Sequence, residues 1–242
     1  MRILAFDTAT GATTVALRDP ADGLELELRD DPPTGERPGH VTRLLPMIGD
    51  LLEQAGSGWE AVELIAVGVG PGTFTGLRIG IATARALAWA REIPLVGISS
   101  LQALATGATT AGEGRDGGRA VLALIDARLG EAFAAAWRGS DRELDPCALR
   151  PEALALEVER LTGADGAAPL AIGDGALRFR GQLEVAGAVV PPQDSTLHRI
   201  SAINHSRLAT GLPATLPTEV EPAYLRAPDA EIADRERHPR AT

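Results

Sequence analysis

The sequence predicts an α/β protein built as two related lobes, each a β-sheet flanked by helices. Short apolar runs such as Leu64–Val69 (LIAVGV) are typical of buried parallel strands, and longer helical stretches alternate with them. A strand pattern from the N-terminus also returns near the middle of the chain. A length of 242 residues is sufficient for two lobes that each bury a core.

The repeated pattern is a strand that ends in aspartate, followed by a glycine and a second strand. Ile3–Asp7 (ILAFD) is followed by Gly11, four residues after the aspartate, and Val121–Asp126 (VLALID) is followed by Gly130 at the same offset. A repeat at this interval indicates two lobes on one plan, which would face each other across a cleft. The alternative is coincidence, because aspartate after a strand is a common turn residue.

Charge and composition narrow the functional classes. The formal net charge of −10 argues against a large basic surface for nucleic acid, so any RNA contact should be local or made by a partner. Cys147 is the only cysteine, which predicts a reducing compartment. The N-terminus enters a strand without the regions of a signal peptide, and no apolar run is long enough to span a bilayer. We expect a soluble, cytoplasmic protein without membrane contacts.

An amphipathic helix is predicted after the N-terminal strands. Strands are expected at Ile3–Phe6, Thr13–Leu17 and Leu24–Leu28, followed by a loop over Asp30–Gly39. Val41–Gln54 then carries apolar residues at helical spacing on one stripe. Pro46 lies in the second turn, where it removes one backbone hydrogen bond and can bend the helix. His40, just before the helix, either faces a site or a partner or is structural.

A glycine-rich turn, Gly70–Gly76 (GPGTFTG), separates the strand Leu64–Val69 from a predicted helix over Leu77–Arg91. Strand, glycine turn and helix form a common anion-binding corner, because the first helical amides point into the turn. The Walker and dinucleotide fingerprints are both incomplete here. A tight structural turn is the alternative. The weak candidates for cofactor binding are Asp7, Gly70, Gly72, Thr73 and Gly76.

The helix over Leu77–Arg91 is apolar around almost its whole circumference, so it should be buried on nearly all sides. One side can cover the sheet. A small face containing Gly80, Ala84 and Ala86 allows another helix to approach closely. Part of the cover is therefore expected to come from a second chain.

The predicted lobes are residues 1–105 and 106–228, with a disordered tail at 229–242. The glycine- and threonine-rich stretch Thr106–Arg119 is expected to be a surface loop at the boundary. The last helix could pack back on the first lobe. Further strands are expected at Leu95–Ile98, Val121–Ile125, Ala132–Trp137, Leu170–Ile172 and Val185–Val190, and further helices at Ser99–Ala105, at Pro151–Leu161, from Ala176, and from Ser195 to about Thr210.

The chain offers few candidate catalytic groups. There is no His-x-x-x-His pair and no Gly-x-Ser-x-Gly element, so we predict neither a metal site nor a serine nucleophile. Gly173–Gly175 (GDG) could be a phosphate or metal turn, although an ordinary turn is favoured. No catalytic residue is assigned. The four histidines are scattered along the chain, at His40, His198, His205 and His238.

Several stretches together resemble one known family. They are Leu4–Thr10 (LAFDTAT), His40–Pro46 (HVTRLLP), Ala66–Gly80 (AVGVGPGTFTGLRIG), Val96–Leu101 (VGISSL), Ile125–Arg128 with Gly130 and Glu131, and Pro222–Arg226 (PAYLR). On these stretches the chain resembles the bacterial TsaB family, also called YeaZ, whose members are paralogues of TsaD. TsaD is the subunit that makes threonylcarbamoyladenosine in transfer RNA. The resemblance covers most of the chain and is weakest over residues 138–218.

The resemblance implies an actin/hexokinase-like (ASKHA) fold and a non-catalytic role. In TsaD a His-Leu-Glu-Ala-His type metal motif follows the strand that corresponds to Leu95–Ile98. This chain has Ser100 and Leu104 at the two histidine positions, and leucine cannot bind a metal. The resemblance therefore implies no cofactor of its own, with a nucleotide possible only in complex with a partner.

The family also implies partners. A TsaB-like chain pairs through its first lobe with a TsaD-like paralogue, and with a TsaE-like ATPase the assembly transfers a threonylcarbamoyl group to adenosine in transfer RNA. Alone, such a chain forms homodimers through the same surface, and it contacts tRNA only indirectly. The surface is expected on the helices over Val41–Gln54 and Leu77–Arg91. The alternative is that these two helices simply cover their own sheet. The predicted interface residues are His40, Val41, Leu44, Leu45, Ile48, Arg78, Ala82 and Ala86.

Two rival functions remain open from the sequence. One is a self-sufficient enzyme, either a glycoprotease-like hydrolase or a small-molecule kinase, that uses the inter-lobe cleft with Asp7, Asp126, Gly70–Gly76 and, more weakly, Asp174. The other is direct binding of tRNA through a local strip of arginines. The acidic balance of the chain disfavours this last possibility. The strip would consist of Arg78, Arg85 and Arg91.

Overall fold

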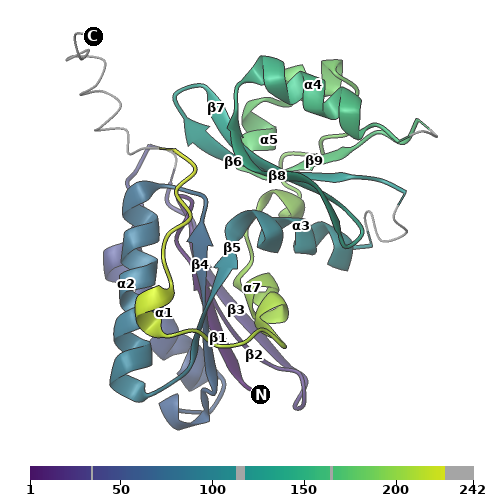
Figure 1. Cartoon of the computed structure of the whole chain (residues 1–242). Helices are drawn as coiled ribbons and strands as arrows, with labels where there is room; N and C mark the ends of the chain where they lie inside the picture. The colour runs from purple at the N-terminus through teal and green to yellow at the C-terminus, as the bar shows by residue number, and fades with distance from the viewer. Residues whose placement is uncertain (34, 113–117, 164–165, 227–242) are drawn as a thin grey trace.

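The computed structural model describes residues 1–33, 35–112, 118–163 and 166–226, which form two mixed β-sheets (Figure 1). The strand order of the first sheet is β3-β2-β1-β4-β5. The strands β1, β2 and β3 form an antiparallel meander, whereas β4 and β5 run parallel to β1. Their bounds are β1 (Ile3–Asp7), β2 (Thr13–Asp19), β3 (Leu24–Asp30), β4 (Leu64–Gly70) and β5 (Leu95–Ser99).

The second sheet repeats the plan of the first. Its order is β8-β7-β6-β9, again with an antiparallel meander and a parallel strand on the other side of the first strand. The strands are β6 (Val121–Arg128), β7 (Glu131–Arg138), β8 (Asp141–Leu149) and β9 (Leu170–Ile172). Asp7 and Asp126 stand in equivalent strands, and each carboxylate accepts a hydrogen bond from the amide two residues later, at 2.6 and 2.9 Å. The predicted duplication is therefore confirmed.

Helices cover both faces of the first sheet. Side chains alternate along β1, so that Leu4 and Phe6 face α1 (His40–Gln54) and α2 (Phe74–Arg91), while Ile3 and Ala5 face α3 (Ser100–Thr110) and α7 (Ala202–Ala209). All four of these strand residues are fully buried. The first sheet is thus completed by α7, a helix contributed from near the C-terminus (Figure 1).

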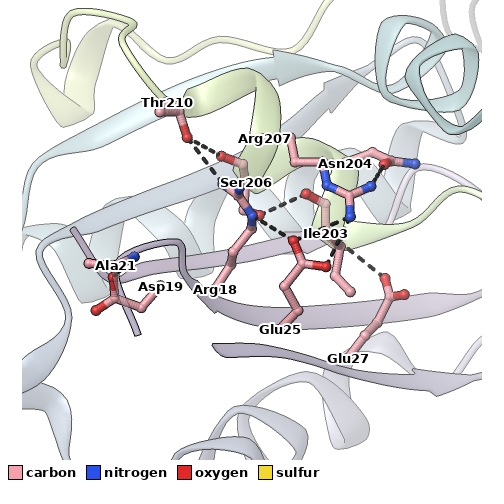
Figure 2. Close-up of polar contacts among 10 residues, drawn as sticks. All are labelled: Arg18, Asp19, Ala21, Glu25, Glu27, Ile203, Asn204, Ser206, Arg207 and Thr210. Atoms are coloured by element: carbon pink, nitrogen blue, oxygen red, sulfur yellow. Dashed lines mark hydrogen bonds and ion pairs between the residues drawn. The ribbon is translucent and has the colours of Figure 1, made fainter. Parts of the chain in front are cut away.

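Polar contacts fasten α7 to the β2–β3 hairpin (Figure 2). The Glu27 carboxylate accepts hydrogen bonds from the amides of Ala202 and Ile203, two donors at the start of a helix that have no acceptor within the helix. At the other end of α7, the Arg207 guanidinium pairs with the Glu25 carboxylate at 2.9 Å. These contacts fix both ends of α7 on the sheet.

The helix α3 lies between the two sheets (Figure 1). Its Leu101 and Leu104 pack against Val121 and Ala123 of β6, while Ala103 packs on the first sheet. The other face of the second sheet is covered by α4 (Pro151–Leu161), α5 (Asp174–Arg178) and α6 (Arg180–Val185). Short 3₁₀ turns complete the structure at Trp59–Ala61, Thr196–His198 and Pro217–Glu219.

The structure corrects the boundary predicted between the lobes. Thr106–Thr110 continues α3 instead of forming a loop, because Ala105 and Ala108 are buried between the sheets and this burial outweighs the low helix propensity of glycine and threonine. Residues 113–117 of that predicted loop and the predicted tail 229–242 lie outside the described residues. The helix α2 also begins earlier than expected, at Phe74.

Three further predictions in the second half were wrong. The stretch Ser195–Thr210 is a 3₁₀ turn followed by the separate helix α7, and the helix predicted from Ala176 is divided between α5 and α6 near Phe179. Val185–Val190 forms only an isolated bridge to β9 rather than a strand. The strand β8 was not predicted: it is an edge strand, and its charges and Pro146 are typical of edges rather than of buried strands.

Candidate partner interface on helices α1 and α2

The helices α1 and α2 pack beside each other on the outer face of the first sheet. Each helix buries one face in the chain's own core. The buried residues are Leu44, Met47, Ile48, Leu51 and Leu52 of α1 and Leu77, Ile81, Ala84 and Ala88 of α2. The opposite faces carry the remaining apolar residues, so these faces decide whether a partner can bind.

Three of the predicted interface residues belong to the core instead. His40, Leu44 and Ile48 are each less than 4% exposed, so they cannot contact a partner on the surface. The apolar stripe of α1 is wider than the face that touches the sheet, and the sequence alone did not show which part of it was left uncovered. The correction restricts the interface on this helix to its exposed edge.

His40 is held inside by two hydrogen bonds. Its Nε2 donates to the Thr10 carbonyl at 3.1 Å, and its Nδ1 lies 2.8 Å from the Thr13 hydroxyl, which therefore donates to the unprotonated nitrogen. Burial lowers the pKa of His40 below its ordinary value, although the charges of Asp7 and Asp30 oppose this. The residue fixes the start of α1 against the turn after β1.

Val41 and Leu45 are the exposed apolar residues of α1, with 75% and 54% of their surface accessible. Arg43 pairs with Asp30 of β3 at 3.2 Å, which marks the flank of α1 that faces the sheet edge. Residues two positions away lie roughly 200° around the helix. Val41 and Leu45 therefore point away from β3, toward the side on which α2 lies.

On α2 the exposed positions Ala82, Ala86 and Trp89 follow helical spacing along one side, and Trp89 is 77% accessible. Small residues at two of the three positions allow a second helix to approach closely. We call these three residues, together with the exposed Val41 and Leu45 of α1, the outer helical surface. It contains five of the apolar side chains that the described chain exposes on helices of the first lobe.

Arg78, also predicted at the interface, is exposed but already has contacts within the chain. Its guanidinium lies 3.8 Å from the centre of the Phe74 ring, and its Nε donates to the Tyr224 hydroxyl at 3.1 Å. The rings of Phe74 and Tyr224 stack with their centres 5.3 Å apart. This C-terminal aromatic contact was not predicted from the sequence, in which its only signal was the Pro222–Arg226 motif.

The glycine turn is filled by the chain itself. A side chain at Gly72 would meet the Ala9 carbonyl oxygen at 2.3 Å, and one at Gly76 would meet that of Thr8 at 2.0 Å. The amide of Thr73 donates to the Ala9 carbonyl at 2.7 Å. The glycines therefore allow the start of α2 to lie against the turn after β1, and these contacts favour the structural alternative. Gly70 adopts a φ of 102°, which is favourable only for glycine.

The carboxylate of Asp7 is sealed in a polar network and is 1% exposed. It accepts hydrogen bonds from the Ala9 amide at 2.6 Å and from the Ser100 hydroxyl at 2.5 Å, and its Oδ2 lies 2.9 Å from Nε2 of His205 in α7. Burial alone would raise the pKa of Asp7, but His205, Ser100 and the Ala9 amide hold it below its ordinary value. With its oxygens occupied, this residue does not fit the role of a ligand for a nucleotide-bound divalent ion.

The acids of the second lobe are likewise engaged. Asp126 pairs with Arg178 at 3.1 Å, and Asp174 accepts a hydrogen bond from the Asp126 amide at 2.9 Å. A cavity of about 450 Å³ lies between the lobes, with Asp31 and Asp174 in its lining. The one guanidinium in that lining, Arg29, already donates to Asp31 and to a backbone carbonyl. The cavity therefore lacks a free cation for a phosphate among the residues that line it.

Within the described residues, no group of three or more histidine, cysteine or acidic side chains is placed to hold a metal ion. His198 is buried and contacts backbone oxygens of Gly173 and Pro191, and His205 contacts Asp7. Cys147 is on the edge strand β8. His238 lies outside the described part of the chain. A search of the same residues for a helix long and apolar enough to cross a membrane finds none.

Comparisons with known proteins agree on one family. The model of the TsaD family, described as tRNA N6-adenosine threonylcarbamoyltransferase, matches residues 33–164. The tRNA threonylcarbamoyladenosine biosynthesis protein TsaB of Escherichia coli K12 is 38% identical over 172 residues, which are 67% of this chain and 68% of that protein. The TsaB of Haemophilus influenzae is 35% identical over 133 residues, or 55% of this chain and 52% of that protein.

Solved structures give the same result. A crystal structure from Pseudomonas aeruginosa, described as similar to peptidase YEAZ, superposes with a TM-score of 0.72 at 30% identity and covers 93% of this chain and 99% of that one. The duplicated sheets, with helices on both faces, define a two-lobed α/β protein with the fold of the YeaZ structures. Within that class, the chain belongs to the TsaB (YeaZ) family.

Proposed function

We propose that this chain is a non-catalytic subunit for threonylcarbamoyl transfer to adenosine in tRNA, which acts by pairing with a TsaD-like paralogue. A TsaE-like ATPase would complete the assembly. The names of the TsaB relatives support the pathway. The single observation that carries the pairing is the outer helical surface, on which Val41, Leu45 and Trp89 are exposed beside small residues.

The energetics of this surface favour a helical partner. Burying a side chain such as Leu45 or Val41 contributes roughly 1.5–3 kcal/mol, and part of this gain offsets the cost of association. Tryptophan is enriched among the residues that dominate binding, and Trp89 stands at one end of the surface. Ala82 and Ala86 let the partner helix come near enough to pack against all of them.

A second copy of the chain could use the same surface when no paralogue is present. Such a homodimer would be isologous, with the same patch on both subunits. It would compete with the paralogue because both need Val41, Leu45 and Trp89. A nucleotide, if one is bound, would be held only in the complex with the partner.

The internal chemistry supports a role without turnover. Asp7 is occupied by Ser100 and His205, and Leu104 stands where a metal ligand would be needed. The net charge of −10 supports tRNA contact through the partner rather than directly. We place the protein in the cytoplasm with its tRNA substrate complex.

Reconstitution tests this proposal. The purified paralogue, the ATPase, a threonylcarbamoyl donor and tRNA are incubated with and without this chain, and modified adenosine is measured by mass spectrometry of the nucleosides. Product should depend on the chain. Leu45→Glu should lower affinity for the paralogue at least about tenfold, because a charge would be buried without a partner. Leu156→Glu, a matched change at a 65% exposed leucine of α4, should not.

Two results would overturn the proposal. One is full product formation by the other components when this chain is omitted. The other is hydrolysis or phosphoryl transfer by the chain alone, which would support the rival enzyme.

A further inference from the structure

The segment Thr215–Arg226, which we call the strap, crosses from the first sheet to the second lobe. In Figure 1 it is the yellow ribbon that runs along α2 toward the upper sheet. At its beginning, the Thr215 amide donates to the Leu95 carbonyl of β5 at 2.9 Å. Further on, Val220 is buried in the core beneath α2, and the Ala223 amide donates to the Val69 carbonyl of β4 at 2.8 Å.

One flank of α2 is bound to the strap. Arg85 donates to the carbonyls of Thr218 and Val220, and Arg78 donates to the Tyr224 hydroxyl. A groove of about 560 Å³ remains between the helix and the strap, and Ala82 of the outer helical surface is part of its lining. The strap therefore contacts the flank of α2 that carries Ala82 of the outer helical surface.

The far end of the strap is anchored on the second lobe. The Arg226 guanidinium donates to the Glu131 carboxylate at 3.0 Å and to the Ala127 carbonyl at 2.9 Å. These groups flank the tip of the β6–β7 hairpin, where Arg128 and Leu129 have φ angles of 61° and 47°. Left-handed backbone at two successive residues other than glycine is unfavourable and needs support from its surroundings. The strap supplies that support at both sides of the tip.

We infer that the strap is a positioning device that holds α2 in register with the second lobe, and that Arg226 is its positioning residue. Loosening this anchor weakens association at the outer helical surface, although Arg226 is not part of that surface. This inference rests on the proposed function only for the identity of the partner. The anchoring itself can be measured on the chain alone.

The test compares Arg226→Gln with a matched control. Arg150 also contacts Glu131, at 3.4 Å, but it is 76% exposed and lies outside the strap, so Arg150→Gln removes an arginine from the same carboxylate without touching the anchor. Amide hydrogen exchange is followed at Ala223 and in the first turns of α2. Affinity is measured by sedimentation for self-association and by calorimetry for the paralogue. Urea unfolding reports whether the fold is retained.

In Arg226→Gln we expect exchange at Ala223 and in early α2 to rise at least about tenfold, because the strap opens locally. Association should weaken about three- to tenfold, while unfolding by urea stays close to wild type. Arg150→Gln should change neither exchange nor affinity.

Unchanged hydrogen exchange at Ala223 in Arg226→Gln would overturn the inference that Arg226 anchors the strap. Faster exchange with unchanged affinity would overturn the coupling to α2. A wild-type chain that self-associates but does not bind the paralogue would contradict the proposed function. The coupling between the strap and α2 would then be tested by the self-association of Arg226→Gln. A wild-type chain that associates with neither would overturn both the proposed function and the coupling.

Discussion

The carboxylate of Asp7 and the imidazole of His205 lie 2.9 Å apart in the interior, although 198 positions separate them in the chain. Nδ1 of His205 lies 3.0 Å from the Ser201 carbonyl oxygen, and Nε2 lies 2.9 Å from the Asp7 carboxylate, so each ring nitrogen faces an oxygen. The pair joins the first strand of the chain to one of its last helices.

Asp7→Asn should therefore destabilise the fold. The change replaces a buried carboxylate that accepts hydrogen bonds from the Ala9 amide and the Ser100 hydroxyl and faces His205. Breaking a buried pair of this kind costs about 3–5 kcal/mol. Urea unfolding at pH 7 measures the loss. Asp50→Asn, at an exposed position of α1, is the control and should have little effect.

The same pair predicts a dependence of stability on acid. The pKa of Asp7 is lowered in the folded state, so the ionised carboxylate stabilises the fold. This contribution to the free energy of unfolding is complete above the ordinary pKa of 3.8 and is lost as the pH falls through the lower folded pKa. The difference in unfolding free energy between wild type and Asp7→Asn should narrow below about pH 4. A difference that stays constant down to the acid limit of folding would contradict the lowered pKa.

His40 gives a second, separate pH effect. Its pKa is lowered from 6.5 by burial, so the folded chain keeps the ring neutral while the unfolded chain takes up a proton. Stability should fall as the pH decreases from about 6.5, and less steeply in His40→Gln. Nuclear magnetic resonance titration of the ring measures its pKa directly. A measured pKa at or above 6.5 would show that burial does not hold the ring in its neutral form.

Two glycines in the outer helices should respond oppositely to alanine. A Cβ at Gly76 would lie 2.0 Å from the Thr8 carbonyl oxygen, so Gly76→Ala should lose at least about 2 kcal/mol of stability. A Cβ at Gly49 of α1 has no neighbour within 4 Å, so Gly49→Ala should gain about 0.5–1 kcal/mol from helix propensity. Thermal or urea unfolding compares them. Equal effects of the two changes would show that the turn after β1 does not press on α2.

Ala86→Glu should abolish association without unfolding the monomer. Ala86 is exposed, so glutamate there is tolerated in the free chain, but a bound helix would bury its charge. Sedimentation velocity and circular dichroism report the two properties. Val185→Glu, at a 90% exposed position on α6, should leave association intact. An unchanged dimer in Ala86→Glu would exclude this part of α2 from the interface.

The strands and the duplication were predictable because they depend on local patterns. Leu64–Gly70 is free of charged residues and Val121–Ile125 is a continuous apolar run, and the turn at each aspartate involves only residues two positions apart. The helix α3 was predicted too short, because its second half is stabilised by burial between two sheets rather than by its own residues. The edge strand β8 could not be predicted from its own residues, because it is formed only by pairing with β7.

The site was predictable only in part. The amphipathic pattern located α1, and the long apolar stretch without a helix breaker located α2. Neither pattern could show that Leu44 and Ile48 are covered while Leu45 is not. That distinction depends on the angle at which α1 meets the sheet. The helix over Leu77–Arg91 was expected to be buried on nearly all sides, whereas the side chain of Trp89 is exposed. The strap has no periodicity at all, and its place is set by contacts with residues more than 90 positions away in the sequence, as for Arg226 and Glu131.

The placement of α7 has a consequence for how the protein is made. The strands of the first sheet are complete once Ser99 has been synthesised, but one of the helices that cover their inner face is not translated until Ala202–Ala209. Until then the nascent sheet exposes Ile3 and Ala5 near that gap, and Asp7 has no His205 beside it. The first strand therefore cannot complete its packing until α7 has been synthesised. Early termination of translation would release a chain with this apolar face exposed, which is the kind of surface that chaperones and proteases bind.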